Sequence, residues 1–483
     1  MIRLIAALIL MQSSACLGMV QDPVSNTASE PPVIDERPDV LYLIVDDLGW
    51  HDVGFTGGRS HLTPHIDALA SQSTVFDHAY SDAPNCAPTR ASILSGQATA
   101  RHGVLTVGSS RRGKKSLRRI EPVPNQRFLD PELPTLADDL QANGYRTVHV
   151  GKFHAGPDPL DYGFTDQVAG TALGHPKSYF SPYRNPKLAD GPNGEYLTDR
   201  LVGEATRFIT SEDQRPLFLH LCFYSVHTPI QARPDLLAVA KTRLPDDRVQ
   251  AQKYDAMVSA VDASVGRILE AFSTRERPLM IIFTSDNGGY GPLADNGPLR
   301  GSKGTLYEGG IRVPLAVRWP GSITAERSDT PVLLRDLVPT ILEVTDASQP
   351  DRIRDGRSLD AIRSGNELDP VPLHWHFPVY LERDSSVVGP WRTTPVAACR
   401  IGRFKLIEFF ESGHLELYDL SSDPSEQSNL AEEFPDLARK MRDEMIQWRM
   451  EVGALLPTPL PDTPSGVEIT PAPDSTSNPE QST

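Results

Sequence analysis

Short apolar runs of strand length alternate with segments of helical periodicity over residues 38–370. Four of these runs are almost continuously apolar, at residues 40–45, 147–150, 217–223 and 279–283. Continuous runs of this length are typical of strands that helices cover on both faces of a parallel sheet. Residues 135–143 and 254–272 repeat their apolar positions at helical spacing, and Gly144 can end the first helix. The pattern predicts an α/β protein with a mostly parallel mixed sheet between layers of helices.

The pattern changes near residue 370, where shorter and more polar strands are expected. Residues 397–410 and 414–420 have the pattern of strands around the Ser412-Gly413 turn, and residues 435–452 that of a final helix. We therefore expect a main domain over residues 38–370 and a smaller C-terminal subdomain over residues 371–455, built from an antiparallel sheet and a helix. Residues 456–483 are rich in Pro, Ser and Thr, which predicts a disordered tail.

The first residues have the order of a secretory signal. Arg3 precedes an apolar run at residues 4–11, which small residues follow, and the run is too short to span a membrane. We expect a signal peptide over residues 1–18, a polar linker over residues 19–37, and a periplasmic or secreted protein. Cys16 leaves a membrane-anchored lipoprotein open as the alternative, although Ser13 stands where lipoprotein signals usually have Leu.

Four cysteines are present, at positions 16, 86, 222 and 399. Export would permit disulfides. If Cys16 belongs to the signal and Cys86 to the chemistry below, Cys222 and Cys399 remain as a possible pair. Cys222 lies inside an apolar strand-like run, so a buried free thiol is the favoured interpretation.

The chain of 483 residues is acidic, with 47 basic and 63 acidic residues and a net charge of −16. Such a charge repels nucleic acid and other polyanions, so an anionic substrate must meet a local basic site. Six of the nine residues from Arg111 to Arg119 are basic. This basic run is either a solvated loop, a protease-sensitive segment or the rim of an active site that attracts an anionic substrate.

Polar side chains follow each of the four apolar runs. In an open parallel sheet the carboxyl ends of the strands form the ligand site, so these side chains should meet at one edge. They are Asp46 and Asp47, Lys152 and His154, His227, and Asp286 and Asn287. Carboxylate and amide oxygens suit calcium or magnesium, and a cation between Asp46 and Asp47 would relieve their repulsion. Taken singly, Asp46-Asp47 is more often a turn or a helix cap, and Asp286-Asn287-Gly288 is a common turn signal. Their joint position after apolar strands favours the metal site.

The segment from Asn85 to Gly96 is the most specific feature of the sequence. Its Cys86, Pro88 and Arg90 fit a Cys-x-Pro-x-Arg pattern, and Ser95-Gly96 follow at a characteristic spacing. In these residues the chain resembles the formylglycine-dependent sulfatases, which have the alkaline-phosphatase-like fold. Further segments resemble that family in order over residues 38–450: Asp46-Asp47-Leu48-Gly49, Gly151-Lys152-Phe153-His154, His227-Thr228-Pro229, Ser285-Asp286-Asn287-Gly288-Gly289 and Arg300-Gly301-Ser302-Lys303-Gly304.

The resemblance implies a mechanism and a role for each matched residue. A formylglycine-generating or sulfatase-maturing enzyme would oxidise Cys86 to formylglycine, whose hydrate supplies the nucleophile. One calcium ion would be held by Asp46, Asp47, Asp286 and Asn287 together with position 86. Arg90 would fix the modified residue, and Lys152 and Lys303 would hold charge on the sulfate. His154 would remove a proton in the elimination of sulfate, and His227, with Lys303, would protonate the leaving alcohol. Phe153 and Ala87 depart from the family pattern beside the site.

The resemblance implies a sulfuric ester hydrolase acting on a sulfated carbohydrate or an aryl sulfate. Two other functions stay open: a phosphodiesterase or phosphonate monoester hydrolase on the same scaffold, and an inactive carbohydrate-binding relative. The complete set of matched residues argues against the inactive relative. The lysine segment around Lys303 and the single cluster of metal ligands favour sulfate over phosphate.

Overall fold

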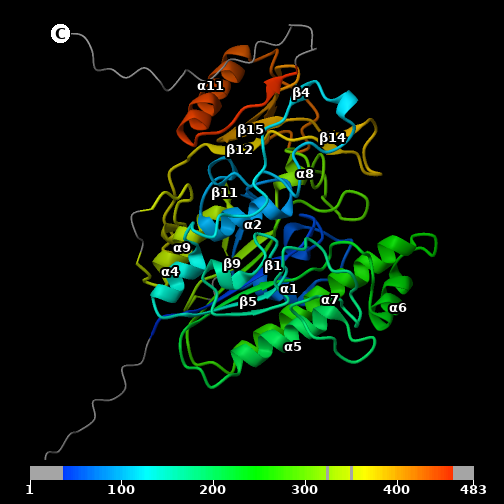
Figure 1. Ribbon diagram of the computed structural model, residues 1–483, viewed down its shortest axis with the longest axis vertical. Helices are drawn as coiled ribbons and strands as arrows, with labels where there is room; N and C mark the ends of the chain where they lie inside the picture. Colours follow the sequence, from blue (N-terminus) through cyan, green and yellow to red (C-terminus); the bar gives the residue numbers. More distant parts are fainter. Residues whose placement is uncertain (1–35, 323–325, 349–351, 461–483) are drawn as a thin grey trace, which may run out of the picture. The chain divides into compact units, whose positions relative to one another are not determined.

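A computed structural model of the protein describes residues 36–322, 326–348 and 352–460 (Figure 1). The expected signal peptide at residues 1–18, with Cys16, lies outside the described residues, as do nearly all of the expected linker and most of the expected tail. Within the described ranges, no helix combines the length and the apolar character that crossing a membrane requires.

The main domain is built on an eight-stranded sheet with the order β10-β2-β9-β8-β1-β7-β5-β6. All pairs are parallel except the two that β9 makes, with β2 and β8. The strands are β1 (Asp39–Val45), β2 (Thr74–Phe76), β5 (Arg146–Gly151), β6 (Asp166–Val168), β7 (Leu217–Cys222), β8 (Leu279–Ser285), β9 (Leu315–Arg318) and β10 (Glu326–Ser328). The expected mostly parallel mixed sheet is thus confirmed.

Helices cover both faces of this sheet (Figure 1). Along β1 the side chains alternate: Val40, Tyr42 and Ile44 enter one apolar core, and the residues between them enter the other. The first core includes residues of α2 (Cys86–Ser95), α4 (Leu136–Ala142) and α9 (Leu337–Val344). The second includes residues of α1 (Pro64–Ala70), α5 (Leu197–Ile209) and α7 (Val249–Phe272). The continuous apolar character of the strands follows from burial on both faces.

The C-terminal subdomain is a four-stranded antiparallel sheet with α11 (Pro435–Glu451) packed on it. Its strands are β12 (Leu373–Phe377), β15 (Val396–Ile401), β16 (Phe404–Phe409) and β17 (His414–Asp419). Residues 397–410, expected as one strand, form two, because the chain reverses at Gly402, whose φ of 58° is left-handed. The hairpin around Ser412-Gly413 is confirmed as β16–β17.

Short elements complete the described fold. Two-residue and three-residue strands pair in small ribbons, and short helices bridge the loops. They are β3 (Ala79–Tyr80), β4 (Ile120–Glu121), β11 (Val332–Leu333), β13 (Leu381–Glu382), β14 (Trp391–Thr393), β18 (Thr458–Pro459), α3 (Thr99–His102), α6 (Pro234–Arg243), α8 (Glu308–Ile311) and α10 (Asp360–Arg363). The pairing of β18 with β4 lies at the start of the segment that the composition assigns to the tail.

Candidate active site

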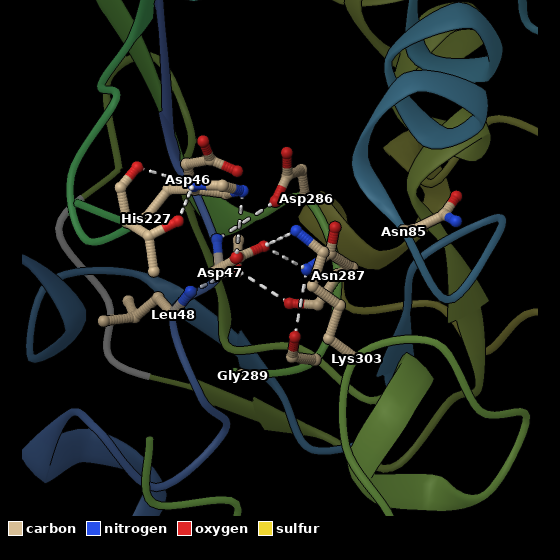
Figure 2. Close-up of polar contacts among 12 residues, drawn as sticks. Asp46, Asp47, Leu48, Asn85, His227, Asp286, Asn287, Gly289 and Lys303 are labelled. Carbon is tan, nitrogen blue, oxygen red and sulfur yellow. Dashed lines mark hydrogen bonds and ion pairs between the residues drawn. The ribbon is translucent and has the colours of Figure 1, made fainter. Parts of the chain in front are cut away.

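Four parallel strands end level with one another and deliver the polar residues to one place. The register pairs Val45 with Ser285, and it pairs Cys222 with both Ile44 and Gly151. The residues that follow these strand ends are the seven expected ones, Asp46, Asp47, Lys152, His154, His227, Asp286 and Asn287. Figure 2 shows Asp47 lying among His227, Asp286, Asn287 and Lys303. The expected meeting of these side chains is therefore observed.

Helix α2 brings Cys86 and Arg90 to the same cluster. Cys86 is the first residue of α2, and its Sγ lies within 4.8 Å of carboxylate oxygens of Asp46 and Asp286. Arg90, one turn further, faces the same side because residues four apart stack on a helix. Its Nε donates to Asp286 Oδ2 at 2.9 Å and its Nη1 to the Lys152 carbonyl at 2.8 Å. Arg90 thus fixes α2 against the ends of β5 and β8.

The acidic residues leave buried oxygens without partners. Asp46 Oδ1 and Asn287 Oδ1 are buried and accept no hydrogen bond from the described residues, whereas the Asn287 amide nitrogen donates to Asp47 Oδ1 at 2.8 Å. Burial raises the pKa of Asp46 well above its usual value, Lys152 opposes this, and Asp286 and Asp47 add to it. Unpaired buried oxygens among crowded carboxylates are the donor set of a hard cation. The residues present therefore fit calcium or magnesium.

Two lysines approach the same carboxylates. Lys152 is fully buried, and its Nζ lies 2.6 Å from Asp46 Oδ2. Lys303 Nζ lies 2.5 Å from Asp47 Oδ1. Burial opposes the charge of Lys303, but Asp47 and its neighbours raise its pKa above the usual value, so the ammonium group stays charged. Two fixed positive charges beside Cys86 can stabilise an anion bound there.

Two histidines complete the site in their neutral forms. His227 Nδ1 donates to the Thr228 carbonyl at 2.9 Å, so Nε2, 3.6 Å from Asp47 Oδ2, is the atom free to exchange a proton. Burial lowers the pKa of His227 to about 3 and the pKa of His154 well below its usual value. His154 and Asp47 adopt left-handed backbone conformations, with φ of 59° and 64°, which are rare outside glycine and gather at functional sites.

Part of this cluster, Cys86 included, lines a cavity of about 370 Å³. Both histidines, Asp47 and Lys303 belong to its wall. All six basic residues between 111 and 119 are described, and among them Arg112 alone lines the cavity. Of the basic run, Arg112 therefore lies at the rim of the cavity, while Lys114 and Lys115 are exposed to solvent.

Asp52 is a buried residue that supports the site and that no sequence pattern pointed to. Its carboxylate accepts hydrogen bonds from the Gly49 and Asp295 amides, at 2.7 and 2.8 Å, and from the Tyr254 hydroxyl. Asp52 thereby ties the loop after β1 to the loop after β8, both of which carry oxygens of the cluster. His61 lies between Asp52 and Asp255, 3.2 and 2.8 Å from their carboxylates. Because Tyr254, Asp255 and Asp295 are distant in the sequence from Asp52 and His61, no local motif marks these contacts.

Cys222 and Cys399 are buried free thiols, so the favoured interpretation of Cys222 is confirmed and the possible disulfide is not formed. Cys222 begins a chain of hydrogen bonds behind Arg90. Its Sγ lies 3.3 Å from His220 Nε2, and His220 Nδ1 lies 3.1 Å from His149 Nδ1. His149 Nε2 faces the Gly151 carbonyl at 3.2 Å. Because that carbonyl only accepts, neutral tautomers satisfy the whole chain, and the thiol is its first donor.

Family models match nearly all of the described chain. A model described as sulfatase matches residues 38–347, and one described as the C-terminal region of N-sulphoglucosamine sulphohydrolase matches residues 302–451. A protein of Formosa agariphila named sulfatase is 31% identical, over 90% of this chain and 93% of that protein. N-acetylgalactosamine-6-sulfatase of Canis lupus familiaris is 30% identical, over 76% of this chain and 72% of the relative.

Solved structures share the fold. Ps i-CgsB, in complex with k-i-k-neocarrahexaose, superimposes with a TM-score of 0.70 at 27% identity, covering 85% of this chain and 92% of that chain. The phosphonate monoester hydrolase of Agrobacterium radiobacter gives a TM-score of 0.62 at 20% identity, covering 88% and 100%, and that likeness concerns the fold alone. Together with the family models, these matches show that the chain belongs to the sulfatase family of the alkaline-phosphatase-like fold and is an enzyme that hydrolyses sulfate esters.

Proposed function

We propose that the protein removes sulfate from a sulfated carbohydrate outside the cytoplasm, using formylglycine made from Cys86 and one calcium ion. The observation that carries this proposal is the pair of buried oxygens of Asp46 and Asn287 beside Cys86, which have no partner in the part of the chain that the structure describes. Saccharides appear in the names of similar proteins, among them an N-acetylgalactosamine-6-sulfatase and a complex with a neocarrahexaose. The signal-like pattern at residues 3–15 supports export, and Cys16 leaves a lipid anchor possible.

The proposed calcium site consists of Asp46, Asp47, Asp286 and Asn287, with the side chain at position 86 facing it. When bound, calcium supplies positive charge that polarises the sulfate oxygens. The protein's part is to hold the oxygens in place: Arg90 fixes Asp286, and the amide nitrogen of Asn287 fixes Asp47. Asp52 holds together the loops that carry them.

Position 86 requires a second protein in this proposal. A formylglycine-generating or sulfatase-maturing enzyme would oxidise Cys86 before or during export, and the hydrated aldehyde supplies hydroxyl groups for attack on sulfur. Burial of all of α2 keeps position 86 fixed at the wall of the cavity. Arg90, on the same face of α2, orients it.

The remaining residues handle charge and protons. Lys152 and Lys303 stabilise the negative charge of the sulfate as it is transferred, because both ammonium groups are fixed by carboxylates next to Cys86. His154, which is neutral and lines the cavity, takes a proton when sulfate is released. The proton for the leaving alcohol comes from the charged ammonium group of Lys303, and the unprotonated Nε2 of His227, which faces the same Asp47 carboxylate, relays it.

Sulfate release is the direct test of this function. The protein, made in a host that contains a maturation enzyme, is incubated with an aryl sulfate and with defined sulfated saccharides, and free sulfate is measured by ion chromatography. Phosphate diesters and phosphonate monoesters are assayed alongside. We expect sulfate release that Cys86→Ala abolishes. Faster hydrolysis of phosphonate or phosphodiester than of every sulfate ester would favour the alternative enzyme class.

A further inference from the structure

The cavity beside Cys86 can take up more than the sulfate that reacts. Its volume of about 370 Å³ is in the range of sites that enclose whole small molecules. Part of its wall comes from outside the catalytic cluster. Arg112 belongs to the basic run after α3, and Arg392 belongs to β14 of the C-terminal subdomain. Neither residue is needed by the mechanism above.

The segment that carries Arg112 is fixed to the C-terminal subdomain. The Tyr380 amide donates to the Ser110 carbonyl at 3.0 Å, and the backbones of Arg111 and Tyr380 form an isolated parallel β-bridge. Arg112 itself donates from Nε and Nη2 to Glu382 Oε1, at 3.2 and 2.5 Å. Its side chain remains 40% exposed, and Nη1 has no protein partner within the described ranges. Glu382 therefore orients Arg112 without using all of its donors.

Arg392 lies next to the catalytic lysine. Its Nη1 donates to the Lys303 carbonyl at 3.3 Å, and its Nη2 lies 3.0 Å from Asp384 Oδ2. Its Nε is buried and has no hydrogen-bond partner in the described part of the chain. Gly304 makes room for it, since a Cβ there would lie 2.6 Å from Arg392 Cδ. An arginine that lines a cavity and keeps an unused donor can pair with an anionic acceptor there.

The charges of this wall are unbalanced on the side that faces the cavity. Glu382 and Asp384 hold the two arginines but do not line the cavity. Among the described residues, Asp47, already paired with Lys303, is the acid that does. Burial tends to raise the pKa of Glu382, but its hydrogen bond from Arg112, with a contribution from Arg392, lowers it below its usual value. Both guanidinium groups therefore lie close enough to Glu382 to stabilise its carboxylate.

We propose that Arg112 and Arg392 bind a second oxyanion of the substrate, a carboxylate or a further sulfate on the saccharide whose sulfate ester reacts at position 86. The proposal rests on the function proposed above and narrows the substrate class to saccharides with two or more negative charges. Guanidinium groups suit this role because their planar donors match carboxylate and sulfate oxygens. The site also explains how a chain with a net charge of −16 can accept a polyanion.

The test compares three matched substrates: a monosulfated disaccharide with a uronate carboxylate, its methyl ester, and an analogue in which a second sulfate replaces the carboxylate. The variants are Arg112→Gln and Arg392→Gln, with Lys114→Gln as the control, since Lys114 is an exposed member of the same run. For the wild-type protein we expect kcat/KM to be about tenfold lower on the methyl ester than on the free acid, mainly because KM rises. This is the effect that loss of one charged hydrogen bond predicts. Both arginine variants should lose this preference, and Lys114→Gln should keep it. The wild-type preference between carboxylate and sulfate identifies the natural oxyanion.

A binding measurement separates this proposal from the proposed function. Each variant is combined with Cys86→Ala and titrated calorimetrically with the desulfated disaccharide, which retains the carboxylate. Weaker binding in both arginine variants, and unchanged binding with Lys114→Gln, would support the oxyanion site even if no protein released sulfate. Equal rates on the acid, the ester and the disulfated analogue, or an unchanged preference in Arg112→Gln, would overturn it. Should Arg392→Gln fail to fold, Arg112→Gln decides.

Discussion

Asp286 belongs to two interactions at once, which makes it the most informative single residue of the site. It contributes carboxylate oxygens to the proposed calcium site and is the anionic partner of Arg90, with both side chains buried. Asp286→Asn keeps the shape but removes the charge. We expect calcium affinity and kcat/KM to fall at least about 100-fold, since a metal ligand should matter at least as much as its outer-shell supports.

The measurement for Asp286→Asn is elemental analysis of calcium together with sulfate release from an aryl sulfate. Asp436→Asn is the matched control, because Asp436 is exposed on α11 and pairs with Arg439 far from the cluster in sequence. Full calcium content in Asp286→Asn, with activity lost, would place the metal elsewhere. Full activity would exclude Asp286 from the site.

His61 makes a pH-dependent contribution to stability. Burial opposes its charge, but hydrogen bonds to Asp255 and Asp52 raise its pKa from 6.5 to about 9. A raised pKa favours the protonated folded state, so this stability is full below pH 6.5 and is lost as the pH rises through about 9. We expect His61→Gln to cost roughly 3 kcal/mol at low pH, from about 1.4 kcal/mol per pKa unit, and much less at high pH.

Urea unfolding from about pH 6 to about pH 10 checks this expectation, with the exposed His414→Gln as the control. A cost of His61→Gln that stays constant over this range would show that the ring is neutral in the folded protein.

At the residue level, sequence reasoning found the groups that follow strand ends and missed those that support them. Asp46, Asp286 and Lys152 stand directly after apolar runs, and the topology of a parallel sheet brings such positions together. Asp52 and His61 have no such marker. His61 meets Asp255 across 194 positions of the chain, and no periodicity or spacing encodes that contact.

At the level of elements, a buried ion cluster joins the main domain to the C-terminal subdomain. Lys405 of β16 is fully buried, and its Nζ lies 2.9 Å from both Glu308 of α8 and Glu426 after β17. The Glu308 amide also donates to Glu426 at 2.7 Å. Lys405→Met should cost about 3–5 kcal/mol, because it leaves buried carboxylates without their cation.

Urea unfolding at neutral pH measures this cost, and Lys440→Met, at an exposed position of α11, is its control. A change below about 1 kcal/mol for Lys405→Met would mean that the carboxylates are already protonated.

Boundaries of elements were harder to predict than their existence. Helix α7 begins at Val249, five positions before the expected start, because polar residues occupy its first turns. Gln252 is nevertheless buried, and its side chain donates to the Leu244 and Pro245 carbonyls. Strand β9 was also missed. Its four residues are too few for a periodic signal, and its antiparallel place in the sheet depends on contacts with β2 and β8.

At the level of the whole molecule, the proposed metal is part of the fold as well as of the chemistry. Asp46, Asp47 and Asp286 are buried together at the end of the central strands, and the oxygens of Asp46 and Asn287 that have no partner among the described residues gain one when a cation binds. We expect a chelator to lower the Tm by about 5 °C or more, because a tightly bound ligand of the folded state stabilises it by several kcal/mol.

Differential scanning calorimetry with stepwise addition of calcium tests this coupling without any assay of activity. Calcium should restore the Tm in a saturable manner, and the Asp286→Asn variant should respond far less. A Tm that is the same with chelator and with calcium would contradict a structural calcium site.

The chemical state of residue 86 decides whether the enzyme works through formylglycine. The active protein is digested, and the peptide that contains residue 86 is examined by mass spectrometry, with and without a hydrazide reagent. We expect this peptide to have lost the cysteine sulfur and to carry an aldehyde that the hydrazide captures, in a fraction that follows the specific activity from one preparation to another. A fully active preparation in which residue 86 is an unmodified cysteine would contradict this expectation.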